Sequence, residues 1–220
     1  MKLIIFDVDG TLVDSQNFIV EAQKRAFEAH SIPAPDRAAM LSIVGLSLVQ
    51  AFIELVGPDG PVESLAQSYR EAWQVMRLDP AFADPLYEGA STAIAALALR
   101  KDVMLGVATG KSKRGVDHLF HEQGWHNQFA TVQTADGHPS KPHPSMILAA
   151  LAETGTPPGD AVMIGDTSYD MAMGRAAGVH TIGVSWGYHP RERLLEHGAG
   201  QIVESFDELT AVLASQACWC

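Results

Sequence analysis

The sequence predicts an α/β protein with a doubly wound, mainly parallel sheet and an inserted all-helical unit. Short, continuous apolar runs recur along the chain, and such runs are typical of strands that are covered on both faces of a parallel sheet. From residue 90 onward these runs alternate with helical patterns, which predicts right-handed strand–helix–strand crossovers. Between residues 15 and 84 the alternation stops and only helical patterns remain.

The expected elements of the sheet layer follow from these patterns. Strands are expected over 3–6, 103–108, 161–164 and 180–184, with 129–132 as a weaker candidate. Helices are expected over 90–99, 112–123, 144–153 and 168–177, and the second and fourth are followed directly by glycine, a common helix terminator. Ser205 to Glu208 have the pattern of a capping box that opens a last helix.

The segment 15–84 is expected to form a separate helical cap, with 1–14 and 85–220 as the α/β core. Leu65, Tyr69 and Trp73 share one face of a helix at helical spacing, and Leu48 and Phe52 share another. Gly45 and the glycine- and proline-rich stretch 57–61 mark turns between these helices. The chain therefore divides into a sheet-containing core and an all-helical insertion.

Composition and charge exclude several classes of partner. The chain has 220 residues, of which 47% are hydrophobic, and it carries 15 basic against 26 acidic residues for a formal net charge of −11. Such a balance argues against nucleic acids and anionic membrane surfaces as partners. Cys218 and Cys220 cannot build a disulfide framework, and no apolar run approaches the length of a membrane span. We expect a cytoplasmic protein, either a monomer or a homodimer.

The first polar motif, Asp7-Val8-Asp9-Gly10-Thr11, follows the first expected strand directly. In an extended chain the two carboxylates would point in opposite directions, so the backbone must coil here, which Gly10 permits. Once the chain coils, one carboxylate can act as a nucleophile while the second transfers a proton. The same pattern also occurs in ordinary turns and calcium loops.

Two further motifs lie later in the chain, at Thr109-Gly110 and at Lys141. Thr109 and Gly110 stand between a strand and a helix, where a hydroxyl group and free backbone amides suit a phosphate oxygen, although Ser112 also reads as a plain helix cap. Lys141 lies between Ser140 and a proline, on a stiffened loop. Nearby His143 has no assigned role.

The last motif is Gly165-Asp166-Thr167-Ser168-Tyr169-Asp170. Asp166 ends a buried strand, where a carboxylate is costly unless a positive group meets it. Asp170 lies one helical turn later on the same side. We expect all four motifs to meet at the carboxyl edge of the sheet, which is where open parallel sheets bind ligands.

Taken together and in this order, the motifs resemble those of the haloacid dehalogenase superfamily, specifically its phosphatase branch with a small helical cap after the first motif. The motifs that carry the resemblance are Asp-x-Asp-Gly-Thr, Thr-Gly, Lys-Pro and Gly-Asp-Thr-x-x-Asp. The resemblance extends over nearly the whole chain and implies a Rossmann-like core. It implies that Asp7 is a nucleophile that forms an aspartyl-phosphate, while Asp9 protonates the leaving oxygen and later activates water.

The resemblance also implies the binding roles. Thr109, Gly110 and Lys141 would bind the transferring phosphoryl group. Mg²⁺ would be held by the carboxylates of Asp7 and Asp166 and by the backbone carbonyl of Asp9. Asp170 would act on the ion through water or orient the lysine. A magnesium ion also suits an acidic protein that must bind phosphate, because it neutralises charge locally.

The expected activity is therefore hydrolysis of a small phosphorylated metabolite. The stretch from Asp9 to Ser15 is typical of phosphoglycolate phosphatases, which makes phosphoglycolate the leading substrate, with Arg37, Arg70 and Arg77 as candidate cap residues for its carboxylate. Asp9 favours phosphoryl chemistry over dehalogenation. The alternatives are a phosphomutase similar to β-phosphoglucomutase and a catalytically silent protein that binds a phosphorylated ligand.

Overall fold

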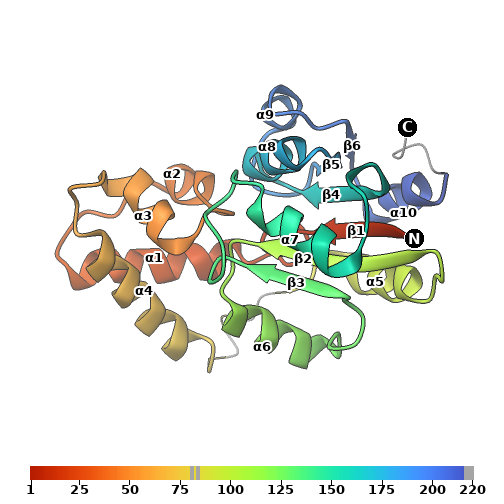
Figure 1. Ribbon diagram of the computed structural model, residues 1–220. Helices are drawn as coiled ribbons and strands as arrows, with labels where there is room; N and C mark the ends of the chain where they lie inside the picture. Colours follow the sequence, from red (N-terminus) through yellow and green to blue (C-terminus); the bar gives the residue numbers. More distant parts are fainter. Residues whose placement is uncertain (80–81, 83–84, 216–220) are drawn as a thin grey trace.

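A computed structural model of the chain describes residues 1–79, 82 and 85–215. Within them a parallel six-stranded sheet has the strand order β3-β2-β1-β4-β5-β6 (Figure 1). The strands are β1 (Lys2–Phe6), β2 (Val103–Thr109), β3 (Thr131–Thr134), β4 (Ala161–Gly165), β5 (His180–Val184) and β6 (Gln201–Val203). All the neighbouring strands pair in parallel, so the predicted doubly wound, Rossmann-like sheet is confirmed.

Helices cover both faces of the sheet, which explains the continuous apolar runs. The helices are α5 (Ala90–Ala98), α6 (Lys113–Gln123), α7 (Ser145–Thr154), α8 (Ser168–Ala177), α9 (Arg191–Glu196) and α10 (Phe206–Ser215). Ile4 and Phe6 of β1 pack in one core cluster with α5, α6 and α10. Leu3 and Ile5 pack on the opposite face with α7 and α8. The side chains of β1 alternate between the two clusters, as the pleat of a strand requires.

Four helices form a helical unit, defined here as residues 16–76, beside one end of the sheet (Figure 1). They are α1 (Gln16–Ala29), α2 (Arg37–Ser42), α3 (Leu48–Val56) and α4 (Val62–Met76). Phe27, Phe52 and Leu65 form the centre of one cluster within the unit. The predicted all-helical character of this region is confirmed, whereas the cap limits at residues 15 and 84 stay a prediction, because residue 84 lies outside the described ranges.

Several boundaries differ from the prediction. Strand β3 begins at Thr131, two residues later than expected, and Phe129 packs against the core. Helix α9 and strand β6 were not predicted, since segments of six and three residues are too short to show a periodic pattern. The capping box at α10 is half present: Ser205 Oγ accepts from the backbone of Glu208, but the Glu208 side chain accepts from the Glu204 amide.

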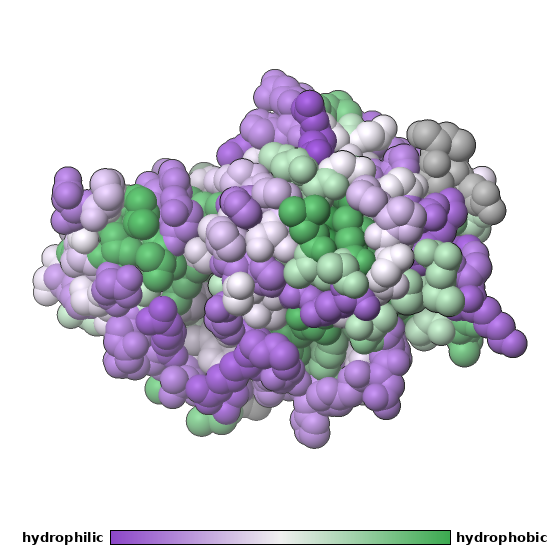
Figure 2. All heavy atoms as spheres, viewed as in Figure 1, coloured by the Kyte–Doolittle hydropathy of each residue, from purple (hydrophilic) through white to green (hydrophobic). Residues whose placement is uncertain are grey.

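The surface in the same view is largely hydrophilic, with hydrophobic patches over α3 and α7 (Figure 2). Among the described residues, no helix combines the length and the apolar character that a membrane crossing needs. Cys218 and Cys220 lie outside the described residues.

Candidate active site

The predicted motif residues meet at the carboxyl edge of the sheet. Asp7 follows β1, Thr109 ends β2, and Asp166 follows β4. Strands β2 and β4 lie on either side of β1 and run parallel to it, so these three ends open at the same edge. The chain winds outward from β1 in both directions, and such a switch point is where open α/β sheets bind ligands.

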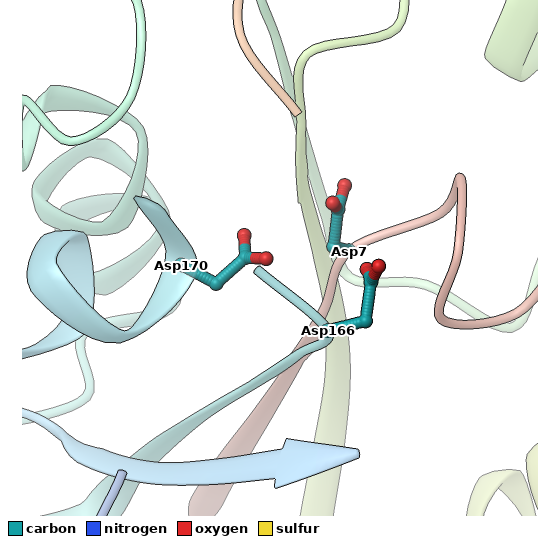
Figure 3. Close-up of side chains that lie close together, drawn as sticks. All are labelled: Asp7, Asp166 and Asp170. Carbon is teal, nitrogen blue, oxygen red and sulfur yellow. The ribbon is translucent and has the colours of Figure 1, made fainter. Parts of the chain in front are cut away.

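Three carboxylates cluster at this edge. One oxygen each of Asp7, Asp166 and Asp170 lies within 4.8 Å of the other two (Figure 3). All three side chains are buried, with exposed fractions of 1% for Asp7 and 0% for the other two. Like charges this close disfavour one another's ionisation, so the cluster requires positive charge nearby.

Lys141 supplies one positive charge. Its Nζ lies 2.9 Å from Asp7 Oδ2 and donates a hydrogen bond to Asp170 Oδ1 at 2.7 Å. Burial lowers the pKa of Lys141, but the charges of Asp170 and Asp7 more than offset this, so that the pKa is raised and the lysine stays charged. The loop that carries it contains a cis peptide bond between Lys141 and Pro142.

Asp170 is itself held by the start of its own helix. Its Oδ2 accepts hydrogen bonds from the backbone amide of Thr167 at 3.0 Å and from the Thr167 hydroxyl at 2.6 Å, forming a capping box at α8. Its other oxygen contacts Lys141. Both oxygens are thus engaged by protein groups, which supports the orienting role for Asp170 over a water-mediated contact with a metal ion.

Burial is the main reason that the pKa of Asp7 rises to about 7, with Asp170 adding to the rise and Lys141 opposing it. Neither oxygen of Asp7 receives a well-directed hydrogen bond from the described residues, although Lys141 lies at ion-pair distance. Burial, followed by the charges of Asp170 and Asp7, also holds the pKa of Asp166 well above its ordinary value. Buried carboxylate oxygens without donors fit a hard divalent cation, which would favour their ionised forms.

Asp9 lies on a tight turn after Asp7. Gly10 has a φ of +86°, and a Cβ there would lie 2.2 Å from Asp166 Oδ2, so the chain coils here as predicted and approaches Asp166 closely. The Oδ1 of Asp9 accepts hydrogen bonds from Ser15 Oγ and Lys111 Nζ, both at 2.8 Å. Neither partner was predicted, although Lys111 directly follows the Thr-Gly pair and carries a positive charge.

The helical unit contacts the core at Gly110. A Cβ on this glycine would lie 2.4 Å from the backbone oxygen of Gly45 and 2.7 Å from that of Leu46. The turn between α2 and α3 therefore lies main chain against main chain on the loop after β2. Next to it, Thr109 is buried and its hydroxyl accepts from the amide of Lys111 at 3.2 Å.

Local capping explains two other residues of these motifs. Ser112 caps α6, since its Oγ accepts from the amide of Gly115 at 3.3 Å. His143 Nδ1 accepts from the amide of Ser145 at 3.2 Å, in the first turn of α7. Both contacts are structural.

The loop of Trp186 to His189 completes the site. Tyr188 donates its backbone amide to Asp166 Oδ2 at 2.9 Å, while Thr11 Oγ1 donates to Oδ1 of the same carboxylate at 2.9 Å. Trp186 packs against the core and donates its indole N–H to the Thr11 carbonyl at 3.0 Å. The Tyr188 contact was not predicted, because residue type does not reveal a hydrogen bond that the main chain donates.

Replacing Gly187 by alanine should disrupt this support. A Cβ at Gly187 would lie 2.1 Å from Asp166 Cβ, so either the loop or the carboxylate must shift. We expect a loss of about 1–3 kcal/mol in the free energy of unfolding, as for overpacked cores. Because Asp166 is expected to hold Mg²⁺, we also expect the activity to require a higher magnesium concentration. Thermal denaturation and a magnesium titration measure both. Gly137→Ala is the matched control, because nothing lies within 4 Å of a Cβ there, and equal behaviour of the two variants would contradict the prediction.

Side-chain hydrogen bonds also join the helical unit to the core. His189 Nδ1 accepts from the amide of Ser168 at 2.9 Å, so its proton lies on Nε2, which donates to the Ser42 carbonyl at 3.1 Å. The Tyr169 hydroxyl donates to the same carbonyl at 3.2 Å. Burial, followed by the charge of Arg193, lowers the pKa of His189 to about 4, which keeps the ring neutral and this arrangement intact at neutral pH.

A cavity of about 520 Å³ lies between the carboxylate cluster and the helical unit. The core contributes polar groups, including Asp7, Asp9 and Lys111, and the helical unit contributes a mainly hydrophobic wall. The hydrophobic wall consists of Phe18, Ile19, Ile43, Val44, Leu46, Leu48, Val49, Ala51, Phe52, Leu55, Tyr69 and Trp73. The volume falls within the range of small-molecule sites.

Of the three arginines predicted as cap residues for a substrate carboxylate, only Arg70 lines the cavity. Arg37 donates to the side chains of Gln16 and Asn17 on α1. Arg77 lies over the ring of Trp73, 5.3 Å from its centroid. The core adds Arg114, another exposed arginine that lines the same cavity.

Comparison with known proteins agrees with this geometry. A family profile described as haloacid dehalogenase-like hydrolase matches residues 4–184. A protein of Dickeya dadantii named "Probable phosphatase IndB" is 35% identical, over 94% of this chain and 91% of its own length. A phosphoglycolate phosphatase of Rhodospirillum rubrum is 31% identical, over 94% of this chain and 89% of its own. A solved structure described as a predicted phosphatase from Clostridium acetobutylicum superposes with a TM-score of 0.83 at 27% identity, covering 97% of this chain and 98% of that one.

Proposed function

The chain belongs to the haloacid dehalogenase-like hydrolase family, and on that basis we propose that it is a phosphatase that hydrolyses phosphate monoesters through a phosphorylated Asp7. The proposal rests mainly on the position and surroundings of Asp7. It is a buried carboxylate at the end of the central strand, it lines a ligand-sized cavity, and a charged lysine lies 2.9 Å away. The names of the relatives support the same reaction class.

In the first half of the reaction an oxygen of Asp7 attacks the phosphorus atom of the ester. The bond between phosphorus and the ester oxygen breaks, and Asp9 gives its proton to the departing oxygen, so that an alcohol leaves. In the second half Asp9 takes a proton from a water molecule that attacks the phosphorus of the aspartyl-phosphate. Inorganic phosphate leaves and the Asp7 carboxylate is restored. The contact from Lys111 to Asp9 positions this proton carrier.

The neighbouring groups would bind the phosphoryl oxygens. Lys141 carries a positive charge beside Asp7, and the hydroxyl of Thr109 and the backbone at Gly110 line the same cavity. Catalysis of this kind depends mainly on positioning and on neutralising charge as the phosphoryl group moves. Asp170 acts through Lys141, which it holds beside the nucleophile.

The site also fits a magnesium ion. The carboxylates of Asp7 and Asp166, with the backbone carbonyl of Asp9, would hold it, and the oxygens of Asp7 that lack directed donors suit a hard cation best. When bound, the ion would neutralise charge on the phosphoryl group and favour ionised Asp7. The segment 15–84 would serve as the cap that covers this site and contacts a small phosphorylated metabolite, with the protein acting in the cytoplasm.

Phosphate release from a panel of phosphate monoesters tests the proposal. The panel should contain phosphoglycolate, the leading substrate from the sequence, together with a sugar 1-phosphate and larger esters. We expect release in magnesium and its loss in EDTA, restored by added magnesium. Isomerisation of the sugar phosphate without release of phosphate would point to a mutase. Tight binding without any product would point to a silent binding protein.

A further inference from the structure

Gln23 is a buried polar residue in the hydrophobic part of the cavity wall. It lies on α1 with an exposed fraction of 3%, and it is one of the residues that line the cavity. Its Nε2 donates a hydrogen bond to the backbone carbonyl of Met40 at 3.3 Å. Its Oε1 is buried and has no hydrogen-bond partner in the part of the chain that the structure describes.

The orientation of the amide follows from its one contact. The Met40 carbonyl can only accept a hydrogen bond, so the nitrogen must face it and the oxygen must be the unpartnered atom. Buried side-chain acceptors are nearly always paired, and an unpaired one destabilises the fold. Leucine or methionine would fill the same space beside Phe18 and Ile19 without this cost. Because Gln23 is one of the residues that line the cavity, a donor group on a bound ligand would satisfy this acceptor.

We propose that Gln23 determines specificity: its Oε1 accepts a hydrogen bond from an N–H or O–H group on the organic part of the substrate. The substrate class is then a phosphate monoester of a bulky, largely apolar alcohol that carries such a donor away from the ester oxygen. This inference rests on the proposed function, because it places the phosphate at Asp7 and the organic part against the helical unit.

The cavity supports the same class on size and polarity. Its 520 Å³ greatly exceeds what a two-carbon acid fills, and its wall on the helical side is mainly aliphatic and aromatic. An ionised carboxylate such as that of phosphoglycolate offers only acceptor oxygens, so it cannot pair with Gln23 Oε1. Phosphoglycolate thus matches neither the volume of the cavity nor its unpartnered acceptor.

The test compares esters that match in shape and differ in one donor. Suitable pairs are 4-(hydroxymethyl)benzyl phosphate with 4-ethylbenzyl phosphate, and their 3-substituted isomers, which place the donor differently. We expect the wild-type protein to favour the hydroxyl member of at least one pair by about ten-fold in kcat/KM, the scale of one hydrogen bond to a buried acceptor. In Gln23→Met this ratio should fall to near one, with the 4-ethyl ester turned over as well as before.

Two controls make the result specific. Gln74→Met alters another glutamine that lines the cavity, an exposed one, and should leave the ratio unchanged. Melting temperatures of both variants show whether the fold is kept. A wild-type protein that treats the members of both pairs alike would overturn the inference, and so would a preference that survives in Gln23→Met.

Binding separates this inference from the proposed function. Affinities of the same pairs for the Asp7→Asn protein, measured by calorimetry with magnesium, require no turnover. A donor preference in binding that depends on Gln23 would support the inference even if no ester were hydrolysed, which would contradict only the proposed phosphatase reaction. Turnover of the esters without any donor preference would contradict only the inference.

Discussion

Asp7→Asn should abolish turnover while making the metal-free protein more stable at pH 8. The nucleophile is lost, and we expect a fall in kcat on the order of 10⁴-fold or more, as for nucleophile removal in other enzymes. The stability gain follows from the raised pKa: a carboxyl group that ionises near pH 7 in the folded state and near 3.8 in the unfolded state opposes folding increasingly as pH rises between these values. Asparagine carries no such charge.

The measurement is phosphate release together with unfolding by denaturant at pH 5 and pH 8, in EDTA. The gain in the free energy of unfolding should be a few kcal/mol, about 1.4 kcal/mol for each unit of pKa, at pH 8 and much smaller at pH 5. Asp117→Asn, a change on the exposed face of α6, serves as the control and should alter neither quantity. Substantial activity in Asp7→Asn would remove the basis of the proposed mechanism.

Lys141→Met should have the opposite effect on stability. The lysine is the partner of Asp7 and Asp170 in a buried cluster, and its raised pKa means that its charge stabilises the fold at every pH below about 10. Without it three buried carboxylates face one another. Breaking a buried pair in this way typically costs about 3–5 kcal/mol. Turnover should also fall by on the order of 10²–10³-fold, as when one charge-stabilising donor is removed.

The stability of the same variant can also be measured with added magnesium. A bound cation would replace part of the missing charge, so added magnesium should recover more stability in Lys141→Met than in the wild type. Lys113→Met is the matched control, because Lys113 pairs with Asp117 on the surface and such pairs contribute little. Wild-type stability and turnover in Lys141→Met would show that the buried charge is unnecessary.

The sequence predicted the position of the site well because the site follows from topology. Thr109 ends a strand, Asp7 and Asp166 each directly follow one, and parallel strands bring their carboxyl ends to one edge. No tertiary knowledge was needed beyond the order of strands and helices. The pairing of Lys141 with Asp170 was one of two alternatives that the family resemblance implied, and the two side chains are hydrogen-bonded in the structure.

The missed features depend on contacts that residue types do not encode. Tyr188 acts through its backbone amide, and Gly187 matters because of Asp166, which lies far away in the sequence. Gln23 looks like any polar residue on an amphipathic helix until the fold buries it against the cavity. Strand β6 is too short for any pattern, and its neighbour β5 determines where it pairs.

The close approach of Gly110 to the carbonyls of Gly45 and Leu46 means that different atoms of the helical unit contact the core and line the cavity. At this point the helical unit approaches the core through main-chain atoms, whose shape changes little when side chains are substituted. Recognition of the organic part falls to side chains of the cavity wall, such as Phe18 and Gln23, which take no part in that junction. The cavity lining can therefore diverge to accept other ligands while this main-chain junction keeps the same geometry.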